Sequence, residues 1–82
     1  MTYSCAIALS SGIIELRVVY GDGVWSWSIL TAEAQTLDRG VGISKEAAQL
    51  AGQNAFEMRL RWAGMNQQIP NRYDWKRAFE RD

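Results

Sequence analysis

Few residues of this sequence have the types and spacing that catalysis or metal binding requires. Its 82 residues include no histidine, so the commonest general base and the commonest metal ligand are both missing. The single cysteine, Cys5, lies on an apolar strand face and is interpreted as a structural thiol. The acidic side chains do not recur at metal-ligand spacing. We therefore expect no enzyme activity, no cofactor and no metal site.

Two glycine motifs resemble nucleotide-binding loops only superficially. Gly21-Asp22-Gly23 lacks the lysine and the strand-to-helix context of a phosphate loop, and a hairpin turn accounts for it. The stretch "RGVG" at 39–42 is not surrounded by a parallel strand–helix–strand unit. Neither motif predicts a nucleotide site.

Charge and aromatic residues together single out the C-terminal part of the chain. Residues 1–58 carry three basic and six acidic side chains, a net charge of −3, whereas 59–82 carry six basic and three acidic, a net of +3. Basic side chains interleaved with aromatic rings suit a protein-binding hot spot, and they also suit stacking on single-stranded nucleic acid. The candidate partner-binding residues are Arg59, Arg61, Arg72, Tyr73, Trp75, Lys76, Arg77 and Arg81.

Two alternatives to this site stay open. The C-terminal segment could be an amphipathic tail whose rings only pack and whose charges are only solvated. The open sheet face around Arg17, Ser26 and Ser28 is then the other candidate surface.

Three alternating segments predict the sheet that positions these residues. Residues 3–9, 13–20 and 24–30 place apolar side chains at every second position. The third segment includes Trp25 and Trp27, which share a face with the other apolar residues. We interpret them as core, with a ligand platform as the alternative.

Two turns set the register of this three-stranded meander. Ser11-Gly12 and Asp22-Gly23 are the expected two-residue loops, the second of type I′. With these loops every apolar residue falls on one face, and a one-residue slip would place one strand's apolar set on the wrong side. Residues 36–43 predict a fourth strand, made irregular by Gly40 and Gly42.

A long helix is predicted over 45–63, with Ser44 as its N-cap and Gly64 after its end. One stripe of this helix is expected to pack on the sheet and consists of Ala47, Ala51, Ala55, Met58 and Trp62. Phe56 and Leu60 then lie on its far side, where the C-terminal segment or a partner must cover them. Asn71 is the expected cap of a short second helix that runs to the end of the chain.

These elements predict one small α+β domain of two layers, an antiparallel meander of three to four strands with one long helix across it and a short C-terminal helix. Residues 1–43 form the sheet, 44–64 the long helix and 65–82 the C-terminal connection and short helix. No apolar run approaches the length of a membrane span, and no secretory leader is recognised. With its single cysteine, the chain is expected in the cytoplasm, without membrane contact.

Two stretches of the chain resemble known families. The stretch "GISKEAAQLAGQNAFEM", Gly42 to Met58, resembles the strand-to-helix junction of HicB-type antitoxins, in which an alanine-spaced helix follows a small sheet. The meander followed by a helix is similar to part of the double-stranded-RNA-binding domain. Size, architecture and lack of chemistry also resemble those of small phage-encoded inhibitors, including anti-CRISPR proteins.

These resemblances imply a non-enzymatic partner-binding function. The favoured prediction is a phage or mobile-element inhibitor that binds a host protein or protein complex, as a monomer or homodimer. The alternative is a nucleic-acid-binding or antitoxin-like module, whose affinity would fall steeply with salt.

Overall fold

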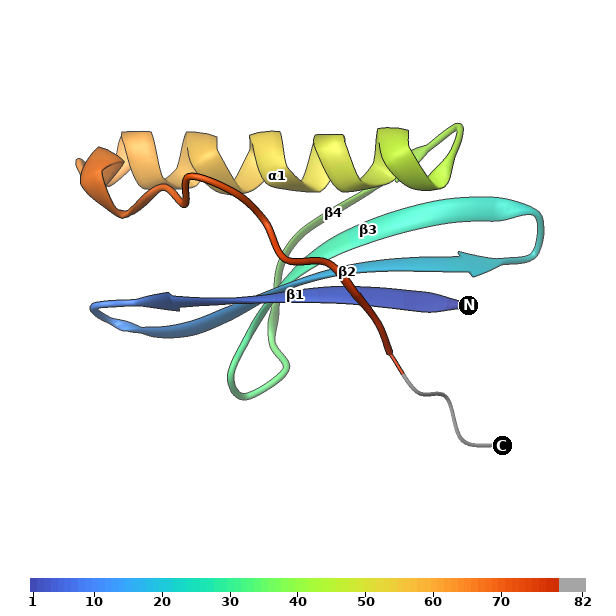
Figure 1. Ribbon diagram of the computed structural model, residues 1–82, viewed down its shortest axis with the longest axis horizontal. Coiled ribbons are helices and arrows are strands. Elements are labelled where there is room, and N and C mark those ends of the chain that lie inside the picture. The colour runs from blue at the N-terminus through green and yellow to red at the C-terminus, as the bar shows by residue number, and fades with distance from the viewer. Residues whose placement is uncertain (79–82) are drawn as a thin grey trace.

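The computed structural model describes residues 1–78 and has two layers, a five-stranded antiparallel sheet and a long helix packed across it (Figure 1). The elements are β1 (Thr2–Leu9), β2 (Gly12–Gly21), β3 (Val24–Thr31), β4 (Thr36–Gly42), α1 (Lys45–Trp62), the 3-10 turn η1 (Asn66–Gln68) and β5 (Lys76–Arg77). Their order across the sheet is β4-β3-β2-β1-β5. The predicted α+β class is confirmed, but a fifth strand takes the place of the expected second helix. No helix in the described part of the chain combines the length and apolarity needed to cross a membrane.

The β2–β3 hairpin has the predicted turn and register. Asp22 and Gly23 both have positive φ, 53° and 76°, as a type I′ loop requires. Tyr20 pairs with Trp25, and Val18 pairs with Trp27. The side chains of these four paired residues therefore share one face of the sheet, which α1 covers.

The β1–β2 turn differs from the prediction by one position. The loop residues are Ser10 and Ser11, and Leu9 pairs with Gly12 instead of Ile14. Each β1 residue thus has a partner two positions from the expected one, which leaves the apolar residues on the same face. The Gln68 side chain anchors the turn, because its Oε1 accepts from Ser10 N at 2.8 Å and its Nε2 donates to Ser10 Oγ at 3.0 Å. This contact comes from the far end of the chain, and local turn preferences do not reveal it.

The glycines of β4 have a packing role that the sequence did not indicate. A Cβ at Gly40 would lie 2.7 Å from the Trp27 ring, and a Cβ at Gly42 would lie 2.7 Å from the backbone N of Ala48. The expected irregularity is present, but the register shift lies between Ile29 and Leu30, away from both glycines. The two glycines therefore let β4 pass close beneath Trp27 and the start of α1.

The ends of α1 agree with the prediction. Ser44 Oγ accepts a hydrogen bond from Ala47 N at 3.1 Å, which caps the first turn. At the other end Gly64 has φ of 72°, and Met65 N donates to Leu60 O at 2.8 Å. This 6→1 hydrogen bond is that of a Schellman motif, in which a glycine after the helix takes the left-handed conformation.

The face of α1 that meets the sheet is not the predicted one. Its buried residues are Ala48, Gly52, Phe56 and Leu60, so Phe56 and Leu60 face the sheet instead of the far side. Relative to the prediction the helix is rotated by roughly a third of a turn. The larger side chains of Phe56 and Leu60 bury more apolar area than alanines would. Gly52, at the same time, leaves room for Trp27 beneath the helix.

The core lies between α1 and the sheet. Its buried cluster consists of Cys5, Ile7, Leu16, Ile29, Phe56 and Leu60. Trp27 is half-buried and packs against this cluster, in the layer where the core interpretation placed it.

The C-terminal segment is extended where a helix was predicted. Lys76 pairs with Ser4 and Arg77 pairs with Tyr3, and Ala78 N donates to Thr2 O at 2.8 Å. Tertiary context overrides the helical pattern here because the edge of β1 offers unpaired backbone groups. Residues 79–82, which include Phe79 and Arg81 of the predicted helix, lie outside the described residues.

Candidate functional site

The aromatic residues predicted to bind a partner are turned toward the molecule itself. The Tyr73 hydroxyl donates to Glu57 Oε2 at 2.7 Å, and Trp75 Nε1 donates to Gln53 Oε1 at 2.7 Å. The Tyr73 ring also meets Phe56 edge to face, with ring centroids 6.5 Å apart. These contacts hold the C-terminal segment against α1, so both rings have a packing role.

Two buried groups remain protonated at neutral pH. Burial, and next the hydrogen bond to the Glu57 carboxylate, raise the pKa of Tyr73 well above its usual range. Burial likewise raises the pKa of the Cys5 thiol. Cys5 is therefore a thiol and not a nucleophilic thiolate. Among the described residues no three His, Cys, Asp or Glu side chains gather in a way that could hold a metal ion.

The predicted basic residues do not form a single cluster. Arg61 pairs with Glu57 at 3.4 Å, and Arg72 pairs with Asp74 at 3.5 Å. Arg59 donates from its guanidinium to the carbonyl oxygen of Leu37 on β4. Arg81 lies outside the described residues. Lys76 and Arg77 are exposed on β5, where alternation along the strand directs them to opposite faces of the sheet.

Strand register brings Lys76 into line with residues far away in the sequence. Lys76 pairs with Ser4, Ser4 with Arg17, Arg17 with Ser28, and Ser28 with Arg39. Directly opposed residues of a sheet point to the same face, so these five side chains form one line across all five strands. The line lies on the open face, away from α1. We call Lys76, Ser4, Arg17, Ser28 and Arg39 the basic row.

The basic row alternates cations with small hydroxyl side chains. Neighbouring strands are about 4.8 Å apart, so successive cations are separated by about 10 Å. Glu15 binds Arg17 through two hydrogen bonds of 3.0 and 3.1 Å, which hold the guanidinium in place and offset part of its charge. Lys76 and Arg39 are exposed. Such a row can attract anionic groups but has no general acid or base for a reaction.

No aromatic ring of the described residues lies on this open face. Tyr3, Tyr20, Trp25 and Trp27 alternate onto the face that α1 covers, and the other described rings belong to α1 and the C-terminal segment. The basic row is flanked on this face by the small side chains of Ala6 and Ser26 and by the larger ones of Glu15, Val19 and Val41. The face therefore offers charge without stacking platforms.

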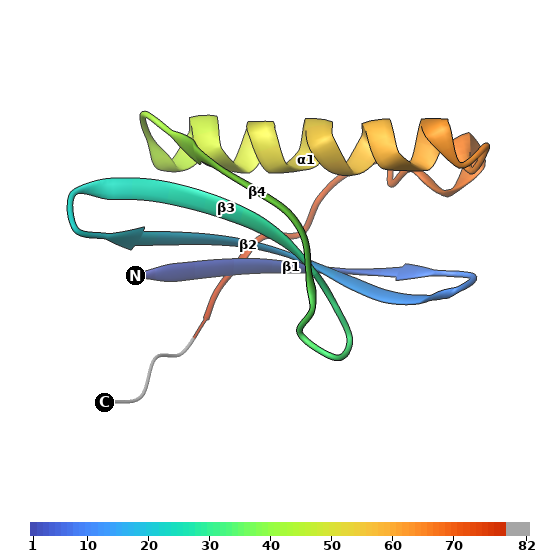
Figure 2. The same ribbon diagram turned by 180° about the vertical axis from the view of Figure 1, so that it is seen from behind.

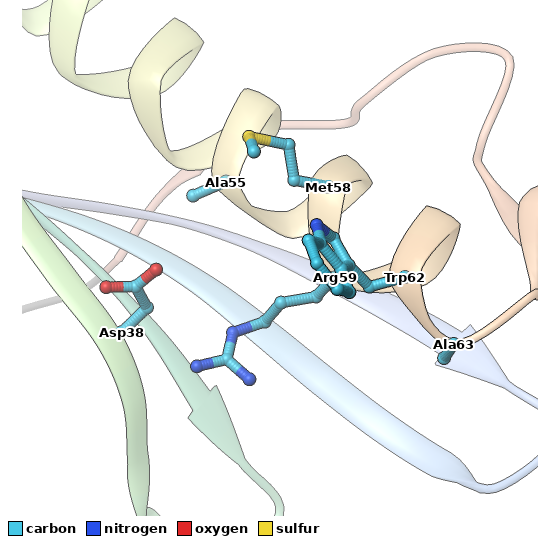
Figure 3. A pocket seen from close by; sticks show the side chains of 6 residues that line it. All are labelled: Asp38, Ala55, Met58, Arg59, Trp62 and Ala63. Carbon is cyan, nitrogen blue, oxygen red and sulfur yellow. The ribbon is translucent and has the colours of Figure 1, made fainter.

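A second surface lies where the end of α1 passes over β4. A hollow of about 550 Å³ opens there and is lined by Asp38, Ala55, Met58, Arg59, Trp62 and Ala63 (Figure 3). Trp62 is 88% exposed and Met58 56% exposed, so this surface is apolar at its centre. Asp38 and Arg59 stand at its border on the β4 side.

Sequence reasoning missed Met58 and Trp62 as surface residues, because it placed their stripe of α1 against the sheet. The sizes of Phe56 and Leu60 were the available signal. Once these two occupy the core face, the helical period places Met58 and Trp62 on the flank beside β4.

The chain has no match among known proteins. Comparisons with protein-family models, with curated protein sequences and with solved structures give none. The argument about function therefore rests on the two surfaces described above.

Proposed function

We propose that this chain is a non-enzymatic protein-binding domain, and that the basic row contacts an acidic segment of its partner. The observation that carries the proposal is the alignment of Lys76, Arg17 and Arg39 across the open face. Backbone pairing fixes the spacing of the three residues, and the ion pair with Glu15 holds the Arg17 guanidinium in place. A side chain that is already held loses less entropy on binding.

The spacing of the cations favours an acidic helix. Carboxylates two turns apart on a helix, seven residues at 1.5 Å each, are separated by about 10.5 Å. This matches the separation of about 10 Å between cations of the basic row.

Nucleic acid is the alternative partner. Single-stranded nucleic acid is usually held by bases that stack on aromatic side chains, and the open face offers no such ring among the described residues. The positive charge of the row is the only feature that favours this alternative. We therefore rank it second.

The finer proposal concerns the class of protein. A small, single-domain chain with no catalytic constellation fits an inhibitor of phage or mobile-element type that binds a host protein complex in the cytoplasm. Its support is the similarity of size and architecture noted from the sequence. A fold-level analogy of this kind is weaker support than a site.

Charge reversal at two adjacent residues of β5 tests the proposal. Lys76→Glu reverses a cation of the basic row, whereas Arg77→Glu makes the same charge change on the opposite face of the same strand. The probe is a synthetic helical peptide with glutamates every seventh residue, and a shuffled peptide of identical composition serves as its control. We expect Lys76→Glu to weaken binding of the first peptide by at least about tenfold and Arg77→Glu to have little effect.

The same titration with a labelled thymidine oligonucleotide tests the alternative. Tight oligonucleotide binding that falls linearly with salt on logarithmic axes, and that Lys76→Glu removes, would replace protein by nucleic acid as the proposed partner. Equal effects of the two substitutions on the peptide would move the site away from the open face.

A further inference from the structure

The edge of β4 has backbone groups that no neighbouring strand takes up. In a two-residue hairpin, the pair that closes the loop, Gly21 and Val24, exchanges backbone hydrogen bonds, and bonded and non-bonded pairs alternate from there. By this alternation Trp27 of β3 directs its backbone groups toward Gly40 of β4. The residues of β4 on either side, Arg39 and Val41, therefore direct their N–H and C=O groups outward, away from the sheet.

Side chains occupy only part of this edge. Asp38 Oδ1 accepts from Arg39 N at 2.9 Å, and Arg59 binds the carbonyl oxygen of Leu37. The carbonyl of Arg39 and both backbone groups of Val41 remain available for another strand. Buried or paired backbone groups are the rule in proteins, so an open stretch of strand in an apolar surrounding suggests a pairing partner.

The flank of α1 above this edge is apolar, and its side chains become larger from the start of the helix to its end. It is the stripe that the sequence singled out, with Ala47 and Ala51 near the start of α1 and Met58 and Trp62 near its end. Figure 2 looks onto this side of the molecule, where α1 lies above β4. Small side chains at one end and large ones at the other give this flank the shape of a surface that can pack against its own inverted copy.

We propose that the chain forms a homodimer in which two copies of β4 pair antiparallel about a two-fold axis at Gly40. Arg39 and Val41, whose backbone groups point outward, flank this residue symmetrically, so this register pairs Arg39 of each copy with Val41 of the other. Pairing takes the Arg39 N–H from the Asp38 carboxylate. Centring on Arg39 instead would bring two like charges face to face.

The two-fold axis brings complementary parts together. Ile43 is 98% exposed and Val41 69% exposed. In the dimer, Val41 of each copy lies opposite Arg39 of the other, whose aliphatic stem can pack on it. The same rotation sets Trp62 of one α1 toward the alanines of the other. An isologous interface requires exactly this kind of reciprocal fit between one patch and itself.

Met58 and Trp62, which are 56% and 88% exposed, lie on the flank of α1 that this pairing brings to the second copy. Pairing would also turn two sheets of five strands into one continuous sheet. Both open faces would then lie on the same side, because the axis is perpendicular to the sheet.

The first experiment measures oligomeric state by sedimentation equilibrium of the full chain from about 1 µM to 1 mM. Val41→Pro removes an N–H that points away from the sheet, so it adds no charge and breaks no strand pairing within the monomer. Val41→Ala keeps this N–H and is the matched control. We expect the parent and Val41→Ala to dimerise, and Val41→Pro to raise the dissociation constant at least about a hundredfold.

The second experiment tests the register. Arg39→Cys together with Val41→Cys should give a disulfide-linked dimer on mild oxidation, because opposed residues of paired strands lie within disulfide reach. Each single substitution should give far less disulfide-linked dimer than the double substitution. A parent that is monomeric at the highest concentration, or a dimer that Val41→Pro leaves intact, overturns the proposal. Dimerisation without cross-linking overturns the axis at Gly40.

Peptide binding to the basic row separates this proposal from the proposed function. Val41→Pro should retain peptide binding with its dimer lost, because it changes no charge near the basic row. Lys76→Glu lies at the opposite edge of the sheet and should retain the dimer with its peptide binding lost.

Discussion

The edge of the sheet at β1 is closed by the chain itself, whereas the edge at β4 is closed in part by two side chains. At β1 the C-terminal segment adds β5 and is held by the rings of Tyr73 and Trp75 on α1. At β4 only the side chains of Asp38 and Arg59 reach the outward backbone groups. The first arrangement buries aromatic rings within the monomer, and the second leaves Trp62 in solvent.

The two edges therefore give similar residues two different roles. Both edges carry aromatic and basic side chains, which is why the sequence alone assigned them to one binding segment. In the structure the rings near β5 stabilise the fold, and the rings and aliphatic groups near β4 remain available for another molecule. Substitutions at matched positions can therefore test whether each edge has the role assigned to it.

The largest expected contrast is between the two tryptophans. Trp75→Ala removes a ring that packs on the core cluster and a hydrogen bond to Gln53, so the free energy of unfolding should fall by about 3 kcal/mol. Trp62→Ala should change it by no more than about 0.5 kcal/mol in dilute solution. Urea denaturation of both variants gives the comparison. Similar losses for the two would show that Trp62 also packs within the monomer.

Gly40→Ala probes how closely β4 lies beneath Trp27. The added Cβ would be 2.7 Å from the indole ring, and that ring is held between β4 and α1. We expect destabilisation of about 2 kcal/mol, since overpacking forces side chains and backbone to shift. Gly21→Ala is the control, because a Cβ there meets nothing within 4 Å. Thermal melts of the two variants that coincide would contradict the close approach.

Tyr73→Phe isolates the hydrogen bond to Glu57 and should lower the free energy of unfolding by about 1 kcal/mol near pH 7. The raised pKa of Tyr73 means that the folded state holds the phenolic proton more tightly than the unfolded chain. This contribution is therefore fully present below the ordinary tyrosine pKa of about 10 and is lost as the pH rises above it. The difference in stability between parent and variant should shrink in that range, which denaturation at pH 8 to about 11 can follow.

Asp38→Ala should have the smallest effect, and its sign is informative. The carboxylate competes with a second β4 strand for the N–H of Arg39. Its removal should tighten the dimer by roughly fivefold, as expected for one hydrogen bond of modest net strength. Sedimentation equilibrium measures the change. A weaker dimer would mean that Asp38 contributes to the interface instead of blocking strand pairing at the β4 edge.

The sequence predicted the elements whose signals are local. Asp22-Gly23 determined one hairpin and its register, and Ser44 and Gly64 marked the ends of α1. Alternation placed the residues predicted to face inward, among them Cys5, Leu16 and Trp27, on the face that packs against α1. In each case the deciding interaction joins residues close together in the chain.

The errors concern contacts between distant residues. The rotation of α1 depends on the fit of Gly52 over Trp27, and the position of the first turn depends on Gln68. In the described residues up to 78, the helical pattern that begins at Asn71 gave way to pairing with β1. The basic row was not predicted as a unit, because it joins five strands and needs the register of four strand pairs. Arg17 and Ser28 had been named on the open face, but their alignment with Lys76 required the structure.

The pairing of β5 with β1 also has a consequence for synthesis on the ribosome. The first strand of the sheet acquires its outer neighbour only after Lys76 has emerged, by which time β1 to β4 and α1 are available to fold. Until then a nascent chain exposes the β1 edge, beside core residues still uncovered by Tyr73 and Trp75. Such a transient edge invites wrong pairing between neighbouring nascent chains.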